Sequence, residues 1–132
     1  MLTVRKELLQ LLKEATGLEV YFLQPPINVG ISLPILILEE TSNSDYYYSY
    51  DTDGDVIERE ITDVSYSISI YSSKPHNLYE HMPVIDKLMK RCGFNKMSTS
   101  GDMVLDGIYC KTMTFTGKLE QLENGDVRVY KR

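Results

Sequence analysis

The sequence predicts an α+β fold in which two α-helices pack on one face of a mostly antiparallel β-sheet. Two amphipathic helical stripes, at residues 4–16 and 78–92, are separated by strand-like runs of alternating apolar and polar residues. Two hairpin signals, Asp53-Gly54 and Asn124-Gly125, lie between such runs. A chain of 132 residues is the usual size of one domain, so we expect a single α+β domain over residues 1–132.

The first helix has recognisable ends. Thr3 is the expected N-cap, because its hydroxyl can accept a bond from an orphan backbone N–H. Gly17 is the expected C′ residue, where a left-handed backbone is needed. The stripe expected to face the core is Val4, Leu8, Leu11, Leu12 and Ala15.

Strand-like runs follow the first helix. A short strand at residues 20–22 should end before Pro25-Pro26, since proline cannot donate to a ladder. The continuous apolar run 35–38 predicts a strand that is covered on both faces. Residues 41–45 are polar and turn-like.

A hairpin is expected next, with strands at 46–51 and 56–61 around Asp53-Gly54. From residue 63 to 71 the alternation is regular, with Val64, Tyr66, Ile68 and Ile70 on one face. The phase changes around Thr62-Asp63, which predicts a bulge or bend there.

The second helix should begin at Asn77, with Glu80 completing a capping box. Pro83 removes one backbone hydrogen bond and predicts a kink or a late start. Gly93 should end the helix. Its expected apolar stripe is Leu78, Met82, Ile85, Leu88, Met89 and Cys92.

The C-terminal third predicts strands. We expect strands at 94–98 and 109–119, separated by a turn-rich stretch, and a last strand from Val127 after the Asn124-Gly125 turn.

Composition narrows the functional class. A net charge of −5 argues against a general nucleic-acid binder. No signal peptide or membrane-length apolar run is recognisable, so a cytoplasmic protein is expected. Cys92 and Cys110 are expected to be packed, reduced thiols, because two cysteines do not make a disulfide framework.

No catalytic, cofactor-binding or metal site is expected. The acidic run 51–55 lacks the glycine and glutamate positions of an EF-hand loop, so a solvated hairpin tip is the preferred interpretation. His76 and His81 are five residues apart and should be surface residues rather than ligands. No nucleophile motif or phosphate loop occurs. We therefore expect a protein that is not an enzyme.

The segment between residues 39 and 63 concentrates acids and tyrosines. Nine of the chain's nineteen acids lie there against one base, Arg59. Consecutive tyrosines on a strand point to both faces, so some should be exposed in an isolated subunit, and exposed tyrosine is enriched at interfaces. The alternative is an ordinary edge hairpin with solvated charges.

A basic segment carries the opposite charge. Between residues 87 and 118 six bases outnumber two acids, which suits head-to-tail association into a ring. Mixing of charges on the folded surface would remove this asymmetry. The interface candidates from both segments are Tyr46, Tyr47, Tyr48, Tyr50, Asp51, Asp53, Asp55, Glu58, Glu60, Lys87, Lys90 and Arg91.

The order of elements also resembles a known family. The segments GLEVYF (17–22), LPILILEE (33–40), SYSISIYS (65–72) and YCKTMTFTGKLE (109–120), with a helix between the last two, make the chain similar to tail terminator or tail completion proteins of tailed bacteriophages and prophages, also described as head–tail joining proteins. The resemblance covers nearly the whole chain through element order and short signatures.

The resemblance implies a structural subunit of a hexameric ring at the head-proximal end of the tail, where it ends tail-tube polymerisation and joins the head connector. It implies self-association, a tail tube protein and a head connector protein as partners, and a virion location after assembly in the bacterial host cytoplasm. DNA would pass through an acidic lumen without specific binding, because like charges repel phosphate. It implies no enzyme activity and no cofactor. The alternative is a small non-catalytic protein-binding module, of adaptor or immunity type, using the acidic tyrosine-rich surface.

Overall fold

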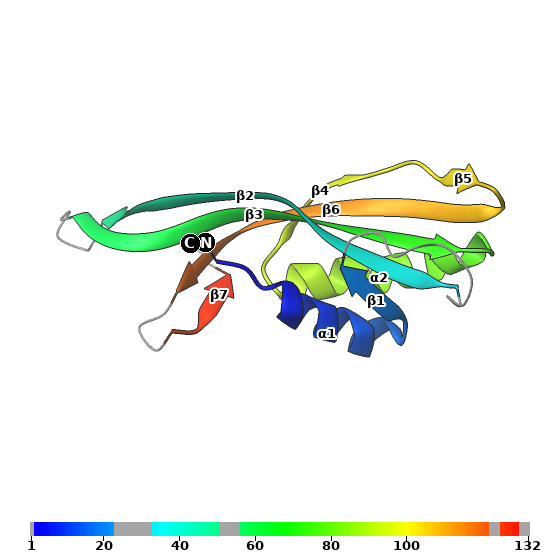
Figure 1. Ribbon diagram of the computed structural model, residues 1–132, viewed down its shortest axis with the longest axis horizontal. Coiled ribbons are helices and arrows are strands. Elements are labelled where there is room, and N and C mark those ends of the chain that lie inside the picture. Colours follow the sequence, from blue (N-terminus) through cyan, green and yellow to red (C-terminus); the bar gives the residue numbers. More distant parts are fainter. Residues whose placement is uncertain (1, 23–32, 51–55, 122–124, 130–132) are drawn as a thin grey trace.

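The computed structural model confirms the α+β class. It describes residues 2–22, 33–50, 56–121 and 125–129, and it describes no side chains at 45–50, 56–60 and 105. Within these residues a seven-stranded mixed sheet carries two helices on one face (Figure 1). The elements are α1 (Arg5–Thr16), β1 (Glu19–Phe22), β2 (Ile35–Tyr50), β3 (Val56–Ser72), α2 (His76–Arg91), β4 (Asn95–Thr99), β5 (Met103–Leu105), β6 (Ile108–Gln121) and β7 (Val127–Val129).

The sheet is built around three long strands, β2, β3 and β6. The strand order is β1-β2-β3-β6-β4, and β5 and β7 also pair with β6. The β1–β2 pair is parallel, and every other described pair is antiparallel. The second edge of β6 is therefore shared by three short strands.

The main core lies between the sheet and the helices. Val64, Tyr66, Ile68 and Ile70 are buried together, as the alternation predicts. All four residues of the apolar run 35–38 in β2 are buried, although successive residues point to opposite faces. The predicted strand is therefore covered on both sides. The helices add Leu8, Leu12, Leu78, Ile85 and Met89 to this core.

The opposite face of β3 and β6 carries a ladder of hydroxyl groups. Ser67 lies opposite Thr114 and Ser69 lies opposite Thr112, with oxygen–oxygen distances of 3.1 and 2.7 Å. These cross-strand pairs satisfy the hydroxyls on the sheet itself. The Asp63–Lys118 ion pair continues this row of cross-strand pairs, so the described side chains of the row are largely paired with each other.

The predicted start and stripe of α1 need correction. The N-cap is Val4, without a side-chain cap bond, because the Thr3 hydroxyl donates to Glu40 at 2.9 Å instead. Leu11 and Ala15 are exposed, since α1 buries mainly its Leu8 and Leu12 side. Gly17 ends the helix with a φ of 72°, as predicted.

Two predictions about β2 and β3 are wrong. Residues 41–45 form no turn, because β2 continues through them. Thr62-Asp63 forms no bulge, because β3 pairs regularly with β6 there. The irregularities lie between Glu40 and Ser42 and between Tyr46 and Tyr48. The Thr41 hydroxyl, at the first irregularity, donates to the carbonyl of Ser65.

The start of α2 also differs from the prediction. Pro75 is the N-cap, and the helix begins at His76 rather than late. The Asn77 amide does not cap the helix but donates to the Ser72 hydroxyl at 2.7 Å. Pro83 lies inside the helix, in its second turn, where only one intrahelical bond is removed. Gly93 follows the helix with a φ of 98°.

The C-terminal part contains one strand that the sequence pattern did not predict. Within the turn-rich stretch, β5 forms a tight hairpin with the start of β6, and Asp106 and Gly107 have φ values of 52° and 77°. Two successive positive φ values are typical of a type I′ turn. The last predicted strand is confirmed as β7, while Asn124 of the predicted turn lies outside the described residues.

Candidate interaction surface

The predicted acidic hairpin is a long extension of two strands. Pairing of β2 with β3 continues to Tyr50 and Val56, whereas pairing of β3 with β6 stops at Ile61 and Glu120. Beyond that point β2 and β3 have only each other as strand partners in the described part of the chain. We name residues 46–50 and 56–60 the β2–β3 ribbon. Figure 1 shows it extending beyond the layer formed by the two helices.

This ribbon contains the predicted interface candidates of the acidic segment. The backbones of Tyr46, Tyr47, Tyr48 and Tyr50 lie on β2, and those of Glu58 and Glu60 lie on β3. Their side chains are not described. Asp51, Asp53 and Asp55, with the calcium alternative for this loop, lie outside the described residues.

The three basic candidates lie on one exposed stretch of α2. Lys87, Lys90 and Arg91 are all exposed. Lys90 is bound to Asp86 at 2.9 Å, and Lys96 approaches the same carboxyl group at 3.6 Å. The hydrogen bond from Lys90 and the nearby Lys96 charge lower the pKa of Asp86. Among the described residues, Lys87 and Arg91 make no ion pair.

Lys87 and Arg91 instead line a groove between the two helices. The groove has a volume of about 170 Å³ and is lined by Ala15, Val84, Lys87, Leu88 and Arg91. We name it the α1–α2 groove. It is open to solvent, and Val84 keeps 38% of its surface exposed. An ordinary solvated helix face is mostly polar, whereas this groove is lined by three apolar residues and two cations.

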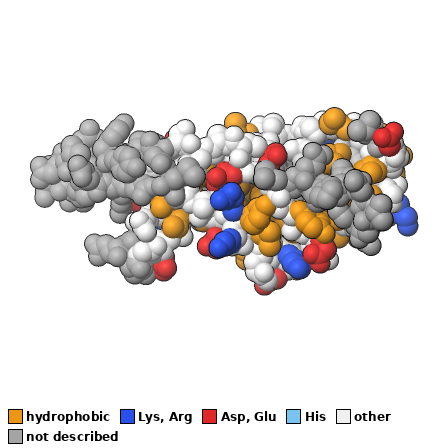
Figure 2. All heavy atoms as spheres, in the orientation of Figure 1, with side chains coloured by type: hydrophobic (Ala, Val, Ile, Leu, Met, Phe, Trp, Pro, Cys, Tyr) orange, Lys and Arg blue, Asp and Glu red, His pale blue; other side chains and the backbone are white. Residues whose placement is uncertain are grey.

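The helical stripes explain why this groove is apolar. Ala15 and Leu88 were predicted to face the core, but the two stripes are wider than the sheet can cover. Leu11, which is 38% exposed, lies on the same uncovered side of α1 as Ala15 because i and i+4 residues share a helix face. In Figure 2, hydrophobic side chains are exposed between charged ones over the helical layer.

The other predicted bases are mostly paired within the chain. Lys111 binds Asp102 at 2.7 Å, and Lys118 binds Asp63 at 2.8 Å. The second pair joins the basic segment to the acidic segment of the same copy. The predicted charge asymmetry is therefore weakened on the folded surface, and the α1–α2 groove keeps its cationic part.

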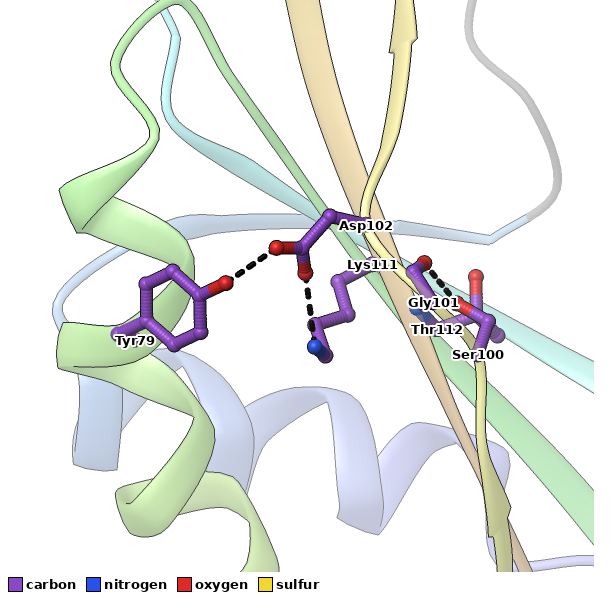
Figure 3. Close-up of polar contacts among 6 residues, drawn as sticks. All are labelled: Tyr79, Ser100, Gly101, Asp102, Lys111 and Thr112. Atoms are coloured by element: carbon purple, nitrogen blue, oxygen red, sulfur yellow. Dashed lines mark hydrogen bonds and ion pairs between the residues drawn. The ribbon is translucent and has the colours of Figure 1, made fainter.

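A polar cluster joins α2 to the start of β5 and to β6. The Tyr79 hydroxyl donates to Asp102, whose other oxygen accepts from Lys111 (Figure 3). The Lys111 ammonium also lies 5.3 Å from the centre of the Tyr79 ring, a cation–π distance. The bond to Asp102 raises the pKa of Tyr79, and the bond from Lys111 lowers the pKa of Asp102. These contacts connect α2 to the residues on either side of β5.

Exposed apolar side chains next to this cluster were not predicted. Met97 on β4 and Met103 and Val104 on β5 are each about 60% exposed. β5 was not predicted as a strand, so the sequence pattern did not indicate which of its side chains would be exposed. Each of these side chains leaves apolar surface exposed on the short strands that pair with β6.

Residues 2–22, 33–50, 56–121 and 125–129 contain no group of three His, Cys, Asp or Glu side chains able to hold a metal ion. His76 is exposed and His81 is half-buried. Cys92 and Cys110 are half-buried thiols that are not joined by a disulfide.

Comparison with known proteins gives no assignment. No protein-family model matches the chain, and no curated protein matches it. In the described part of the chain, neither helix has the length and apolar character required to cross a membrane.

Proposed function

We propose that this chain is a structural subunit of a ring at the head-proximal end of a phage or prophage tail, a hexamer as the resembled family implies. The ring would end tail-tube polymerisation and join the tail to the head connector. It would act in the virion after assembly in the bacterial cytoplasm. The support is the predicted family resemblance together with the α+β fold that it implies.

The observation that carries the proposal is the β2–β3 ribbon. A two-stranded ribbon is marginally stable by itself in water, because it has no sheet or helix to cover a face. Among the residues that the structure describes, neither β6 nor the helix layer accompanies it. Such an element is suited to being covered by another protein subunit, and a heterologous contact of this kind closes into a ring when the rotation permits.

The uncovered apolar regions support the same proposal. Met97, Met103 and Val104 on the short strands and the α1–α2 groove between the helices leave apolar surface in water. A subunit with neighbours on two sides would cover both regions. An enzyme would instead be expected to gather titratable groups in a deep pocket.

Native mass spectrometry and electron microscopy of the purified chain test the proposal. We expect closed hexameric rings, either of the chain alone or on addition of the tail-tube subunit, and shorter tubes when the chain is present during tube polymerisation. A chain that stays monomeric with and without tube subunits, and leaves tube length unchanged, contradicts the proposal. Tight binding of a single basic partner by such a monomer would favour the adaptor or immunity alternative.

A further inference from the structure

We infer that residues 2–4 act as a strap that holds the β2–β3 ribbon in one direction relative to the core. The strap crosses an irregularity in the strand pairing between the core and the ribbon, and it is bonded to the sheet on both sides of that irregularity. Figure 1 shows this segment leaving the start of α1 and running along the sheet towards the ribbon. The inference concerns the isolated chain and does not depend on the proposed ring function.

The strap meets the sheet where the direction of the ribbon is set. We name residues 42–45 and 62–65 the root of the ribbon. At the inner end of the root, the pairing of β2 with β3 shifts register between Glu40 and Ser42, and a bulge of this kind bends a strand and increases its twist. At the outer end, pairing of β3 with β6 stops at Ile61. The root therefore lies between a bend and the loss of the third strand.

Leu2 is bonded to both strands of the root. Its backbone N–H donates to the Thr62 hydroxyl on β3 at 3.3 Å, and its carbonyl accepts from the Asn43 amide on β2 at 3.1 Å. Asn43 lies opposite Val64, and Thr62 lies two residues from it, so both bonds are on the core side of the sheet. One residue of the strap thus ties the two strands together before they lose β6.

The next two residues are bonded on the other side of the register shift. The Thr3 hydroxyl donates to Glu40 at 2.9 Å and lies 3.2 Å from the Tyr66 hydroxyl. The Val4 N–H donates to the same Tyr66 hydroxyl at 3.1 Å, and the Val4 carbonyl accepts from the Leu8 N–H of α1 at 2.9 Å. The strap therefore links the root to the core and to the first turn of α1.

Burial shows that the strap is part of the packed structure. Leu2 and Val4 keep only 7% and 9% of their surface exposed and belong to the main core, which offsets the entropy lost when the segment is ordered. The Asn43 side-chain oxygen is buried and accepts no hydrogen bond from the described residues, which is unfavourable. The bond from the Asn43 amide nitrogen to the strap offsets part of that cost.

Release of the strap is expected to loosen the ribbon and leave the core folded. A two-stranded ribbon twists more than a wider sheet and is marginally stable by itself. Local opening of such an element does not require global unfolding. With the strap in place, the ribbon is presented in one direction, which lowers the ordering cost of any contact that covers it.

Hydrogen exchange of the isolated chain tests the inference. Asn43→Ala combined with Thr62→Val removes both side-chain partners of Leu2 and leaves the sequence of the strap unchanged. We expect the backbone amides of the ribbon to exchange about 10-fold faster or more in this double variant, because opening is confined to the ribbon. Exchange at residues 66–70 should stay at the parent rate. Mass spectrometry of peptic fragments measures both regions.

The matched control removes hydroxyl groups from the opposite face of the sheet. Ser44→Ala combined with Thr114→Val should leave ribbon exchange at the parent rate, because neither residue contacts the strap in the structure. Equal acceleration by both pairs, equal acceleration in the ribbon and the core, or no acceleration overturns the inference. A parent ribbon that already exchanges as an unfolded chain also overturns it. Asn43→Ala alone, at a half-buried position, is the milder variant if the double variant does not fold.

Spin-label distances test the direction of the ribbon itself. Labels at Lys6→Cys on α1 and Ser49→Cys on the ribbon, in a chain with Cys92→Ser and Cys110→Ser, are measured by double electron–electron resonance. We expect one narrow distance distribution in the parent and a broader one in the double variant. Equal widths overturn the inference and leave the ring function standing. Broadening in a chain that forms no rings supports the strap and contradicts the ring.

Discussion

At the scale of single residues, Tyr66 is the centre of the network that fixes the N-terminus. Its hydroxyl donates to Glu40 at 3.0 Å and accepts from the Val4 backbone N–H at 3.1 Å. Its ring is fully buried and meets Phe94 edge-on, with centroids 5.7 Å apart. The sequence predicts Tyr66 on the core face, but alternation alone cannot show that its hydroxyl has partners there.

We expect Tyr66→Phe to lower the free energy of unfolding by about 1–3 kcal/mol. The substitution keeps the ring but leaves the Val4 N–H, a buried donor, without its acceptor. Urea unfolding measures the change. Tyr109→Phe, at a half-buried tyrosine elsewhere on the sheet, is the matched control. Equal stability of the Tyr66→Phe variant and the parent would show that the network does not contribute.

Stability should also fall in alkali because of Tyr66, which is buried, and Tyr71, which is half-buried. Burial raises the pKa of Tyr66 from 10.0 to about 12, and burial with a hydrogen bond involving Cys110 raises the pKa of Tyr71 to about 12. The native state therefore keeps protons that the unfolded chain releases. This contribution to stability is complete below pH 10.0, the unfolded value, and is lost as the pH rises towards about 12.

Urea unfolding at a series of alkaline pH values checks this slope. The Tyr66→Phe variant should lose less stability than the parent over the same interval, since one of the two groups is gone. Parallel pH profiles for the parent and the variant would contradict the assignment to Tyr66.

At the scale of elements, β6 carries a glycine, Gly117, that makes room for Phe94 in the connection between α2 and β4. A Cβ at Gly117 would lie 2.8 Å from the Phe94 ring, whose side chain is buried beneath the sheet. The sequence gives no sign of this close approach, because a glycine inside a strand has several structural explanations. Only the packing of Phe94 against β6 identifies it.

We expect Gly117→Ala to destabilise the protein by about 1–3 kcal/mol, because the Phe94 ring must move out of its packed position. Thermal unfolding measures the effect. Gly101→Ala is the control, since a Cβ there meets nothing within 4 Å. If both variants have the same melting temperature, the close approach of Phe94 to Gly117 does not determine stability.

The long elements could be predicted from periodicity, and the helix starts could not. The apolar stripes located α1 and α2 correctly, and Gly17 and Gly93 marked their ends. The capping predictions at Thr3 and Asn77 failed because both side chains bond to other elements, Glu40 and Ser72. Such tertiary partners are invisible in a local pattern.

At the scale of the whole molecule, the sequence predicts the basic residues of the candidate site but not the groove that they line. The basic residues were identified by charge, and two of them do line the α1–α2 groove. The groove itself was missed, because Ala15 and Leu88 belong to regular helical stripes that a sequence analysis assigns to the core. Which part of a wide stripe the sheet leaves uncovered is decided by how the two helices pack together.

Shortening the ribbon should separate folding from assembly. We expect a chain in which Asn-Gly replaces residues 47–60 to keep the core and to lose less than about 1 kcal/mol of stability, because no third strand pairs with the ribbon in the described part of the chain. The Tyr46–Ile61 pair remains as the last rung before the new turn. Urea unfolding and native mass spectrometry measure the two properties.

Loss of the fold on shortening would show that the ribbon stabilises the core. Retained rings would show that assembly uses other surfaces. The parent chain under the same conditions is the control for both measurements.

The division of one side of β6 among three short strands has a further consequence. β4, β5 and β7 contain 5, 3 and 3 residues, so this border of the sheet is interrupted rather than continuous. Short, broken borders give a foreign strand too few backbone groups to pair with, which discourages fibril growth. This border of the sheet is thus poorly suited to strand addition, and any association there would depend on side chains.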